Sequence, residues 1–475
     1  MNNRPVKILQ FGEGNFLRAF ADWIFDIANE KGVINARVAV VKPRAGGNTS
    51  VIETLNSQHC RYHVCLEGIE NGKPKQEARL ITCIDQAFTP ADSAKYESHI
   101  LSPDLRFIVS NTTEAGIRYA KDNVKDPMPL TFPGKVTSLL WHRFNHFNGD
   151  PSKGIMFIPC ELIEDNGSTL REIVIRHARE ANLGDEFISW IETSCVFVDT
   201  LVDRIVSGAP ANPEEMKARL GADDNAVVVG ELYHLWAIGG EGVEKLHKEL
   251  PLDKAGLNVR FMPSIKEFRD RKVRILNGSH TGMVALSLLA NCETVKDAFT
   301  DKDINAFVCS MVSEEVLPVI DGDPKELQEF ADGILERFLN PYIRHQLKSI
   351  ALNSLSKWET RNYPTVKDYY RKFGKLPRRE VFTLAALLAL YAPNSGFAPD
   401  DNKDSVNFIQ THWNDTDYEA TAKAIISGSG IFQADFEAEV PGITKAVAAH
   451  LASIRKNGIR PSIARGGDFS EIAPH

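Results

Sequence analysis

Short β-branched runs alternate with helical patterns in the first part of the chain. Two segments, residues 16–30 and 168–182, carry apolar side chains at helical spacing. Five apolar runs are typical of buried strands: residues 6–11, 37–41, 106–110, 154–160 and 195–202. Because strands and helices alternate, the pattern predicts an α/β fold in which a parallel sheet has helices on both faces.

From about residue 264 the pattern changes to longer amphipathic or apolar helices. They are expected at residues 279–290, 303–318, 325–339, 341–357, 379–392 and 416–426. A Gly/Pro/Asn-rich joint at 392–402 is typical of a loop. We therefore predict two domains, an α/β unit over residues 1–263 and a mainly α-helical unit over 264–475, with the active site in the cleft between them.

Composition and charge exclude two classes of partner. The 475 residues include 55 Lys and Arg against 63 Asp and Glu, a net charge of −8, so there is no basic excess to hold nucleic acid. The longest apolar stretches, such as 281–291 and 382–392, are shorter than the ~20 residues that span a bilayer. The first residues, MNNRPVKILQ, lack an apolar signal core, so we expect a cytoplasmic protein. The sequence does not indicate an oligomeric state.

The cysteines and histidines do not predict a metal site. The seven cysteines are scattered and form no C-x2-C pair, which favours reduced thiols. His142 and His146 are four residues apart on an expected helix, but the Glu and third ligand of a zinc protease are missing. We therefore expect a packed or solvated histidine pair and no bound metal.

A glycine turn follows the first expected strand. Gly12 and Gly14 come directly after VKILQF and before an amphipathic helix, where a pyrophosphate can approach bare backbone. The third glycine of the usual dinucleotide fingerprint is replaced by Leu17. A tight turn without a ligand would have the same sequence, but the strand–helix–strand context favours a Rossmann-like dinucleotide-binding domain.

Two further loops follow expected strands. The second strand ends in VVKPRAGG, where Lys42 and Arg44 would either receive the 2′-phosphate of NADP or be solvated loop charges. The third is followed by SNTTEAG, residues 110–116, which is typical either of a ligand loop at the sheet edge or of a turn into a helix capped by Thr112 or Thr113.

The segment RDRKVRILNGSHTGMVALSLL, residues 269–289, gathers polar groups at the start of a strongly apolar helix. Asn277 and His280 are three residues apart and share a helix face. Lys272 lies five residues before Asn277, about 140° around an ideal helix, so the three converge more easily if Lys272 precedes the helix. The alternative makes Asn277 an N-cap and Lys272 a solvated cation beside the neighbouring arginines.

These segments resemble the polyol-specific long-chain dehydrogenases typified by mannitol 2-dehydrogenase. The resemblance rests on GEGNFLRAF at 12–20, on SNTTEAG, on LVDRI at 201–205 and on the spacing K-x4-N-x2-H, and it runs along nearly the whole chain. It implies metal-independent hydride transfer with NAD as the cofactor. Within the family, IPCELIEDNG and NPYIRHQLKSIALNS are most similar to members that reduce keto-uronates, which implies a small sugar-acid substrate.

The resemblance also implies roles for particular residues. Lys272 would be the general acid/base, Asn277 a donor to the developing alkoxide, and His280 a ligand of a substrate hydroxyl. A solvated lysine has a pKa near ~10.4, so efficient catalysis at neutral pH needs burial or nearby cations to lower it. The residues expected to contact the cofactor are Phe11, Gly12, Gly14, Asn15, Phe16, Lys42, Asn111 and Thr112.

Substrate-binding residues follow the family pattern less closely. Asp203 matches a position that contacts substrate hydroxyls, although a salt bridge to Arg204 or a helix cap is the alternative. The second alkoxide donor of polyol members is an Asn, but Leu162 stands there, and Asn166 is the expected substitute.

For the carboxylate of a sugar acid we expect Lys357, which matches the family's substrate lysine. Lys348 is the second choice, because it neighbours Ser349, where the family has an arginine. On a continuous helix Lys348 would share a face with Arg344. The alternatives are a different keto-uronate, a neutral hexitol, or a dinucleotide sensor without catalysis; the presence of Lys272 argues against the sensor.

Overall fold

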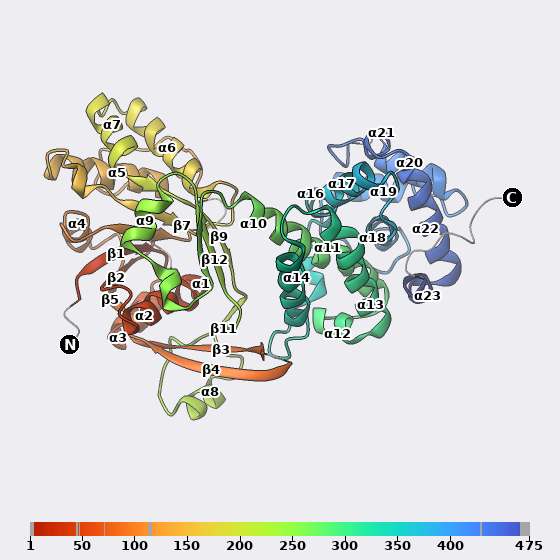
Figure 1. Ribbon diagram of the computed structural model, residues 1–475, viewed down its shortest axis with the longest axis horizontal. Coiled ribbons are helices and arrows are strands. Elements are labelled where there is room, and N and C mark those ends of the chain that lie inside the picture. Colours follow the sequence, from red (N-terminus) through yellow and green to blue (C-terminus); the bar gives the residue numbers. More distant parts are fainter. Residues whose placement is uncertain are drawn as a thin grey trace. The chain divides into compact units, whose positions relative to one another are not determined.

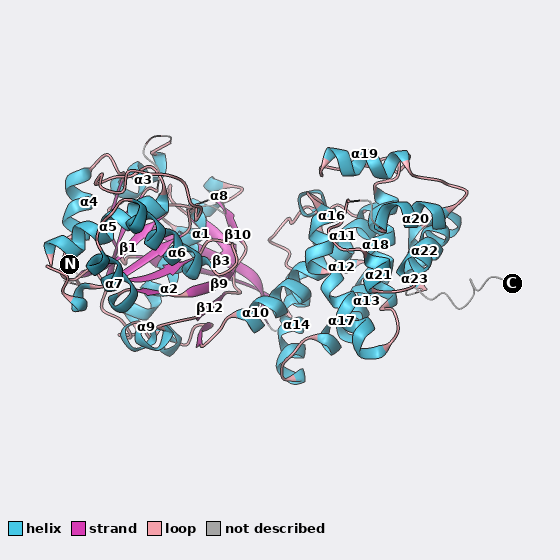
Figure 2. Ribbon diagram, turned by 90° about the horizontal axis from the view of Figure 1, so that it is seen from above, coloured by secondary structure: helices cyan, strands magenta, loops and turns pink. Residues whose placement is uncertain are grey.

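A computed structural model describes residues 4–43, 46, 48–70, 72–112, 116–427 and 430–465 of the chain. The chain divides into two compact units, Met1–Lys266 and Glu267–His475. The first unit contains strands and helices, and the second is built from helices (Figure 2). The α/β fold followed by a mainly helical fold is the class that the sequence pattern predicts.

The first unit is centred on a parallel sheet of six strands in the order β5–β2–β1–β6–β7–β8. Its strands are β1 (Val6–Phe11), β2 (Arg37–Val41), β5 (Ile84–Phe88), β6 (Phe107–Ser110), β7 (Met156–Pro159) and β8 (Val196–Phe197). This is the strand order of a Rossmann fold, and the order reverses between β1 and β6. Ligands of open α/β sheets bind beyond the carboxyl ends of the strands at such a reversal.

Both faces of this sheet are covered, which explains why its strands are almost continuously apolar. Leu9 and Phe11 of β1 pack in one core with α4 to α7, whereas Ile8 packs in a second core with α1 to α3 and α9. In Figure 1, α5, α6 and α7 lie above the strands of this sheet, and α2 and α3 lie below them. The helices are α1 (Asn15–Ala19), α2 (Ala21–Glu30), α3 (Ser50–Ser57), α4 (Ser93–Ile100), α5 (Phe132–His146), α6 (Asn166–Glu180), α7 (Asp185–Ser194), α8 (Pro213–Leu220) and α9 (Val243–Glu249), with 3₁₀ turns η1 (Pro151–Lys153) and η2 (Leu252–Ala255).

Two smaller sheets complete the first unit, in the orders β10–β11–β3–β4 and β13–β12–β9. Their strands are β3 (Tyr62–Glu70), β4 (Lys73–Ile81), β9 (Asp199–Asp203), β10 (Val206–Gly208), β11 (Val228–Glu231), β12 (Leu235–Gly239) and β13 (Val259–Met262). The expected strand at 195–202 is therefore two strands in different sheets. The expected helix at 16–30 is likewise two helices, because the backbone at Phe20 leaves the helical region (φ −120°, ψ −76°).

Asn166 joins the end of β7 to β9 from the first position of α6. Its amide nitrogen donates to the carbonyls of Pro159 (3.2 Å), Glu161 (3.0 Å) and Thr200 (3.2 Å). Its Oδ1 accepts from the backbone N–H groups of Gly167 and Thr200, both at 2.9 Å. The side chain is 1% exposed, so these bonds replace the water that the backbone groups would otherwise bind.

A buried polar group also lies beneath the turn that follows β1. Gln10 Nε2 donates to the carbonyl of Gly12 (3.0 Å) and to Oδ2 of Asp22 (3.3 Å), which also accepts from the Tyr62 hydroxyl (3.1 Å). Asp22 is fully buried, and this desolvation raises the pKa of its carboxyl group from the ordinary 3.8 to about 7.

The second unit is a helical assembly around the apolar helices α11 and α18. Met283 and Leu286 of α11 and Leu384 and Leu387 of α18 are buried in one core. The helices are α10 (Lys266–Arg271), α11 (Gly278–Leu289), α12 (Val295–Thr300), α13 (Lys302–Met311), α14 (Pro324–Phe338), α15 (Leu347–Ile350), α16 (Ser354–Arg361), α17 (Tyr363–Phe373), α18 (Arg378–Leu390), α19 (Lys403–Thr411), α20 (Tyr418–Ile426), α21 (Phe436–Glu439), α22 (Ile443–Asn457) and α23 (Ile459–Ala464). Two π-helical segments, η3 (Lys272–Asn277) and η4 (Val312–Val316), and a 3₁₀ turn, η5 (Leu317–Val319), interrupt them.

The expectation of one helix over residues 341–357 is wrong. Gln346 pairs as a β-bridge with Thr294, α15 lasts one turn, and Asn353 adopts a left-handed conformation (φ 52°) before α16 begins. Arg344 therefore lies outside any helix and does not share a helix face with Lys348.

None of the helices in the described ranges combines the length and apolar character needed to cross a membrane.

We predict that Asn166→Ala lowers the free energy of unfolding of the first unit by about 2 to 5 kcal/mol, because several buried backbone groups lose their partners at once. Thermal and urea unfolding measure the change. Asn145→Ala is the matched control, since Asn145 is exposed and makes one bond, to the Trp141 carbonyl (2.7 Å). Equal stability of the two variants would contradict the bridging role.

We also predict that Asp22→Asn changes how stability depends on pH. The folded state holds the Asp22 proton more tightly than the unfolded state, so the wild type loses stability as pH rises from about 4 to 7, by up to about 4 kcal/mol. The variant has no charge to bury, so its free energy of unfolding should rise relative to that of the wild type across that pH range. Urea unfolding of both proteins at pH 5 and pH 8 tests this, and parallel pH profiles would contradict it.

Candidate functional site

The turn between β1 and α1 presents bare backbone at the carboxyl edge of the sheet. Gly12 has φ +136°, and a Cβ there would lie 3.0 Å from Leu17 Cδ1 and 3.1 Å from the Asn111 carbonyl oxygen. A Cβ on Gly14 would meet nothing within 4 Å among the described residues. Buried Leu17 thus packs against the turn at the position of the missing third glycine, and Gly14 faces space into which a ligand can enter.

The loop after β6 is held at the same edge by a buried carboxylate, Glu161. Its two oxygens accept from the Ser110 hydroxyl (3.0 Å), the Thr112 N–H (2.9 Å) and the Thr112 hydroxyl (3.0 Å). Asn111 donates its amide to the Cys160 carbonyl (2.9 Å). Burial raises the pKa of Glu161. Sequence reasoning missed this residue, although its place directly after a buried strand was a signal.

The aromatic residues and Asn15 of the expected cofactor set contribute in different ways. The Phe11 ring is fully buried against Tyr96 and Phe132, so its backbone is the part that can meet a ligand. Phe16 is partly exposed and stacks on Phe20 at 5.0 Å. Asn15 is exposed, and its Oδ1 accepts from Arg18 at 2.6 Å.

Lys42 follows β2 and is buried. Its ammonium group donates to the Gly46 carbonyl, so at least one of its N–H groups stabilises the loop in which Lys42 lies. Arg44, the other cation considered for a 2′-phosphate, lies outside the described residues.

Asp203 ends β9 and is buried. The adjacent Arg204 donates to the carbonyls of Ala19 (2.6 Å), Tyr233 (3.0 Å) and Leu232 (3.2 Å), so its guanidinium group is satisfied by backbone. Burial lowers the pKa of Arg204 to about 9. Arg204 therefore has a structural role, because its hydrogen bonds connect the end of β9 to α1 and to the loop between β11 and β12.

The two candidates near the end of β7 differ in exposure. Leu162, at the family's asparagine position, is 60% exposed. Asn166 is buried, and its amide already donates to three carbonyls of the first unit. Its hydrogen bonds give it a structural role and leave no spare N–H for an alkoxide.

In the second unit, Lys272 and Asn277 are the first and last residues of the π-helical segment η3. The N–H of Gly278 donates to the carbonyl of Val273, five residues earlier. Residues five apart diverge by about 140° in an α-helix, whereas a turn closed by i→i+5 bonds brings them towards one face. Lys272 and Asn277 can therefore contribute to one site, although η3 and α11 follow one another without a break and Lys272 does not precede the helix.

The N-cap alternative for Asn277 is wrong. Its backbone is helical (φ −72°, ψ −36°), and in the described part of the chain its side chain makes no capping bond. Its Oδ1 is buried and unpaired among the described residues. A buried polar atom without a partner is uncommon, so this oxygen is available to a ligand.

His280 lies one helical turn after Asn277. Its ring stacks on Phe338 (4.5 Å) and meets His345 edge-on (5.1 Å). Its Nε2 is a second buried atom with no hydrogen-bond partner within the described ranges. Burial, together with the charges of His345 and Arg337, lowers the pKa of His280 well below its usual range, so the imidazole is neutral.

The arginines near Lys272 are engaged by carboxylates. Arg274 pairs with Asp270 (2.9 Å) and Asp368 (2.7 Å), and Arg271 lies 3.6 Å from Glu326. They are therefore not the solvated cationic run that was the alternative for this segment.

Cations on the segment from α15 to α16 differ in burial. Arg344 and Lys348 are exposed, and Arg344 faces Glu293 at 3.4 Å. Lys357 is partly buried and donates to the Ile350 carbonyl (3.1 Å). Arg361, which sequence reasoning did not select, donates to the hydroxyl of Thr281 (3.2 Å), the residue after His280.

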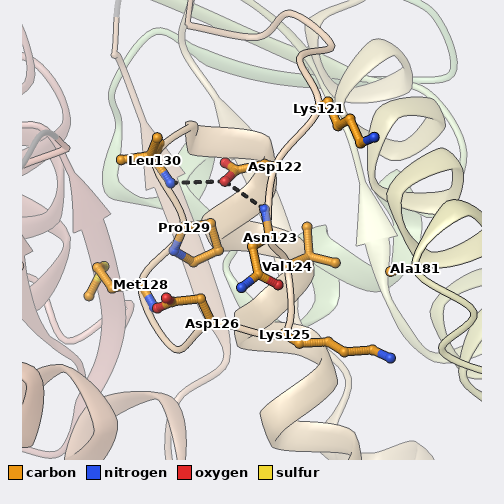
Figure 3. Close-up of a pocket in the computed structure, with 10 residues that line it drawn as sticks. All are labelled: Lys121, Asp122, Asn123, Val124, Lys125, Asp126, Met128, Pro129, Leu130 and Ala181. Atoms are coloured by element: carbon orange, nitrogen blue, oxygen red, sulfur yellow. Dashed lines mark hydrogen bonds between the residues drawn. The ribbon is translucent and has the colours of Figure 1, made fainter.

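A cavity of about 700 Å³ lies elsewhere, on the loop between β6 and α5. Figure 3 shows the Asp122 carboxylate at its edge, turned towards the N–H groups of Asn123 (2.9 Å) and Leu130 (3.2 Å) of the same loop. None of the sequence-predicted site residues lines it, and its Asp122 carboxylate is used by the loop itself.

Metal ligands do not gather in the described residues, where no group of three or more His, Cys, Asp or Glu side chains could hold an ion. All seven cysteines are described and are free thiols.

Comparison with known families and curated proteins gives full-length matches. The family model described as the mannitol dehydrogenase Rossmann domain matches residues 6–254, and that described as the mannitol dehydrogenase C-terminal domain matches residues 264–455. The altronate oxidoreductase of Bacillus subtilis (strain 168) is 41% identical over 464 residues, which cover 97% of this chain and 95% of the relative. The altronate oxidoreductase of Phocaeicola vulgatus is 38% identical over 468 residues, covering 97% and 96%.

Solved structures agree in fold. A substrate-free D-sorbitol dehydrogenase aligns with a TM-score of 0.81 at 22% identity, covering 96% of this chain and 95% of the other. The mannitol 2-dehydrogenase of Pseudomonas fluorescens, solved as a ternary complex with NAD and D-mannitol, aligns with a TM-score of 0.71 at 21% identity, covering 97% and 94%.

Proposed function

Because this chain belongs to the mannitol dehydrogenase family, we propose that it is an NAD-dependent oxidoreductase that interconverts altronate and the keto sugar acid tagaturonate. The observation that carries this proposal is the 41% identity to an altronate oxidoreductase over nearly the whole of both chains. The polar groups at the start of α11 support it, since they suit the reduction of a ketone.

The residues of the first unit fit a dinucleotide. The backbone from Gly12 to Gly14 can approach a pyrophosphate, because a Cβ on Gly14 would project into space free of the described residues. Asn111 and Thr112 lie at the same sheet edge and are fixed by bonds to the β7 end. When bound, NADH supplies the hydride for ketone reduction. The cofactor is NAD, as in the mannitol 2-dehydrogenase complex of the same fold.

The residues of the second unit handle the proton and the charge on oxygen. As the ketone carbon receives hydride, its oxygen becomes negative, and a positioned donor stabilises that charge. We assign proton transfer to the Lys272 ammonium group and a hydrogen bond to the same oxygen to the Asn277 amide. The neutral His280 offers its unpaired Nε2 to a substrate hydroxyl. In the oxidation of altronate, Lys272 in its neutral form accepts the hydroxyl proton.

For Asp203 of the first unit, contact with a substrate hydroxyl group stays a prediction from the family resemblance. We also propose that the enzyme works in the cytoplasm on a dissolved sugar acid, which the seven free thiols support.

We predict that Lys272→Ala lowers kcat by 10²- to 10⁴-fold and that Asn277→Ala lowers it by about 10²- to 10³-fold, because they remove the acid/base group and an alkoxide donor. NADH consumption with tagaturonate measures both. Lys325→Ala is the control, since Lys325 is an exposed helix cation (86%) in the same unit. Near wild-type turnover in Lys272→Ala would contradict the acid/base role of Lys272.

We predict a preference for NADH over NADPH that survives the double substitution Lys42→Ala, Arg44→Ala. Steady-state kinetics with both cofactors provide the comparison. A wild type that prefers NADPH, together with a variant that has lost most NADPH-dependent activity, would show that these cations bind a 2′-phosphate.

A further inference from the structure

Helix α16 carries two partly buried cations one helical turn apart, Lys357 and Arg361. Side chains four residues apart lie on the same face of a helix. Their hydrogen bonds go to neutral oxygens, those of the Ile350 carbonyl (3.1 Å) and the Thr281 hydroxyl (3.2 Å). In the ranges that the structure describes, neither cation forms an ion pair, whereas Arg271 and Arg274 of the same unit both face carboxylates.

Asp401 is the carboxylate that acts on the charge of Lys357, but within the part of the chain that the structure describes it does not form an ion pair with either cation. Asp401 stabilises the charge of Lys357, but its Oδ2 accepts from the Leu355 N–H (3.0 Å) and the Tyr391 hydroxyl (2.8 Å). Burial lowers the pKa of both cations, and the charge of Arg361 lowers that of Lys357 further. Two like charges that are partly removed from water and form no ion pair are unfavourable, so an anion that binds both would stabilise them.

The pair lies on a helix that packs against the elements carrying the residues assigned above to substrate. Arg361 donates to Thr281, which follows His280, and its charge contributes to the low pKa of the imidazole. Helix α16 packs against both α11 and η3. The unpaired Nε2 of His280 and the side-chain amide of Asn277 belong to these same elements. A sugar acid whose ketone oxygen meets Asn277 and whose hydroxyl group meets His280 therefore has a cationic surface close to its other end.

We propose that Arg361 joins Lys357, the lysine already expected to bind substrate, at the carboxylate group of the substrate, and that Arg361 sets the preference for sugar acids over neutral sugars. Nη1 is the guanidinium nitrogen that donates to Thr281, which leaves the Nε and Nη2 donors for a two-pronged contact with a carboxylate. Lys357 adds a second charge from the same helix face. This inference rests on the proposed function, because it assumes a carboxylate-bearing substrate.

The first experiment compares two substrates. For Arg361→Gln and Lys357→Met, kcat/KM is measured with tagaturonate and with tagatose, its neutral ketohexose counterpart. We expect each variant to lose about 10- to 150-fold on tagaturonate, as for a lost charged hydrogen bond, and less than threefold on tagatose. An equal loss on both substrates, or no loss on either, overturns the proposal.

Two further variants separate charge from structure. Arg361→Lys keeps the positive charge but cannot make the two parallel hydrogen bonds of a guanidinium group, so it should retain more of the preference for the acid than Arg361→Gln does. Thr281→Val removes the tether of Arg361 while the cation remains, so most of the preference should persist. If Thr281→Val abolishes the preference as fully as Arg361→Gln, the charge is not its source. Arg344→Gln is the control, since Arg344 is an exposed cation of the same segment that already faces Glu293.

Calorimetry distinguishes failure of this subsite from failure of the proposed reaction. The wild type in the presence of NAD should bind D-gluconate at least tenfold more tightly than sorbitol, and Arg361→Gln should remove the difference. A wild type that reduces no tagaturonate but keeps this binding preference would contradict the reaction and leave the subsite standing. Active wild type with equal binding of gluconate and sorbitol would contradict the subsite alone.

Discussion

The wide helical turn from Lys272 to Asn277 determines which side chains of the second unit can act together. Helix α11 is apolar and buried along most of its length, and apart from Ser287 its polar side chains gather at its start. Backbone bonding over five residues brings Lys272 towards the face that carries Asn277 and His280. The three residues proposed to act on the ketone oxygen and on a substrate hydroxyl thus come from nine consecutive residues. Helix α16, packed alongside, adds Arg361 through Thr281.

The first unit depends on a related constraint, the need to satisfy backbone groups where buried strands end. Glu161 fixes the loop after β6, and Asn166 fixes the chain between β7 and β9. Both side chains belong to the segment that departs from the polyol enzymes. Their hydrogen bonds show that polar residues after a strand can be required by the fold alone, so that polarity after a strand does not by itself indicate a ligand.

The sequence predicted secondary structure best where a strand is buried on both faces or where apolar side chains recur at a regular spacing. Strands β1, β2 and β6 were predicted because both of their faces are covered. Strand β4 was not, because it is an edge strand whose mostly exposed residues, KPKQEARLI, lack an apolar alternation. The break at 343–353 depends on a bridge between Thr294 and Gln346, a tertiary contact that local periodicity does not contain. The contact of Arg361 with Thr281, 80 residues away in sequence, is likewise tertiary, so the role proposed for Arg361 could not be derived from local sequence.

A π-helical turn is an α-helical turn with one residue inserted, and this has an evolutionary consequence. Deletion of any one residue between Lys272 and Asn277 would restore regular helix and rotate Lys272 by about 100° relative to α11. Because α11 is held in place by its apolar core, the helix could not rotate back to compensate. Homologous enzymes should therefore diverge here by substitution, and the length of this segment should be inherited unchanged even where its amino acids are not.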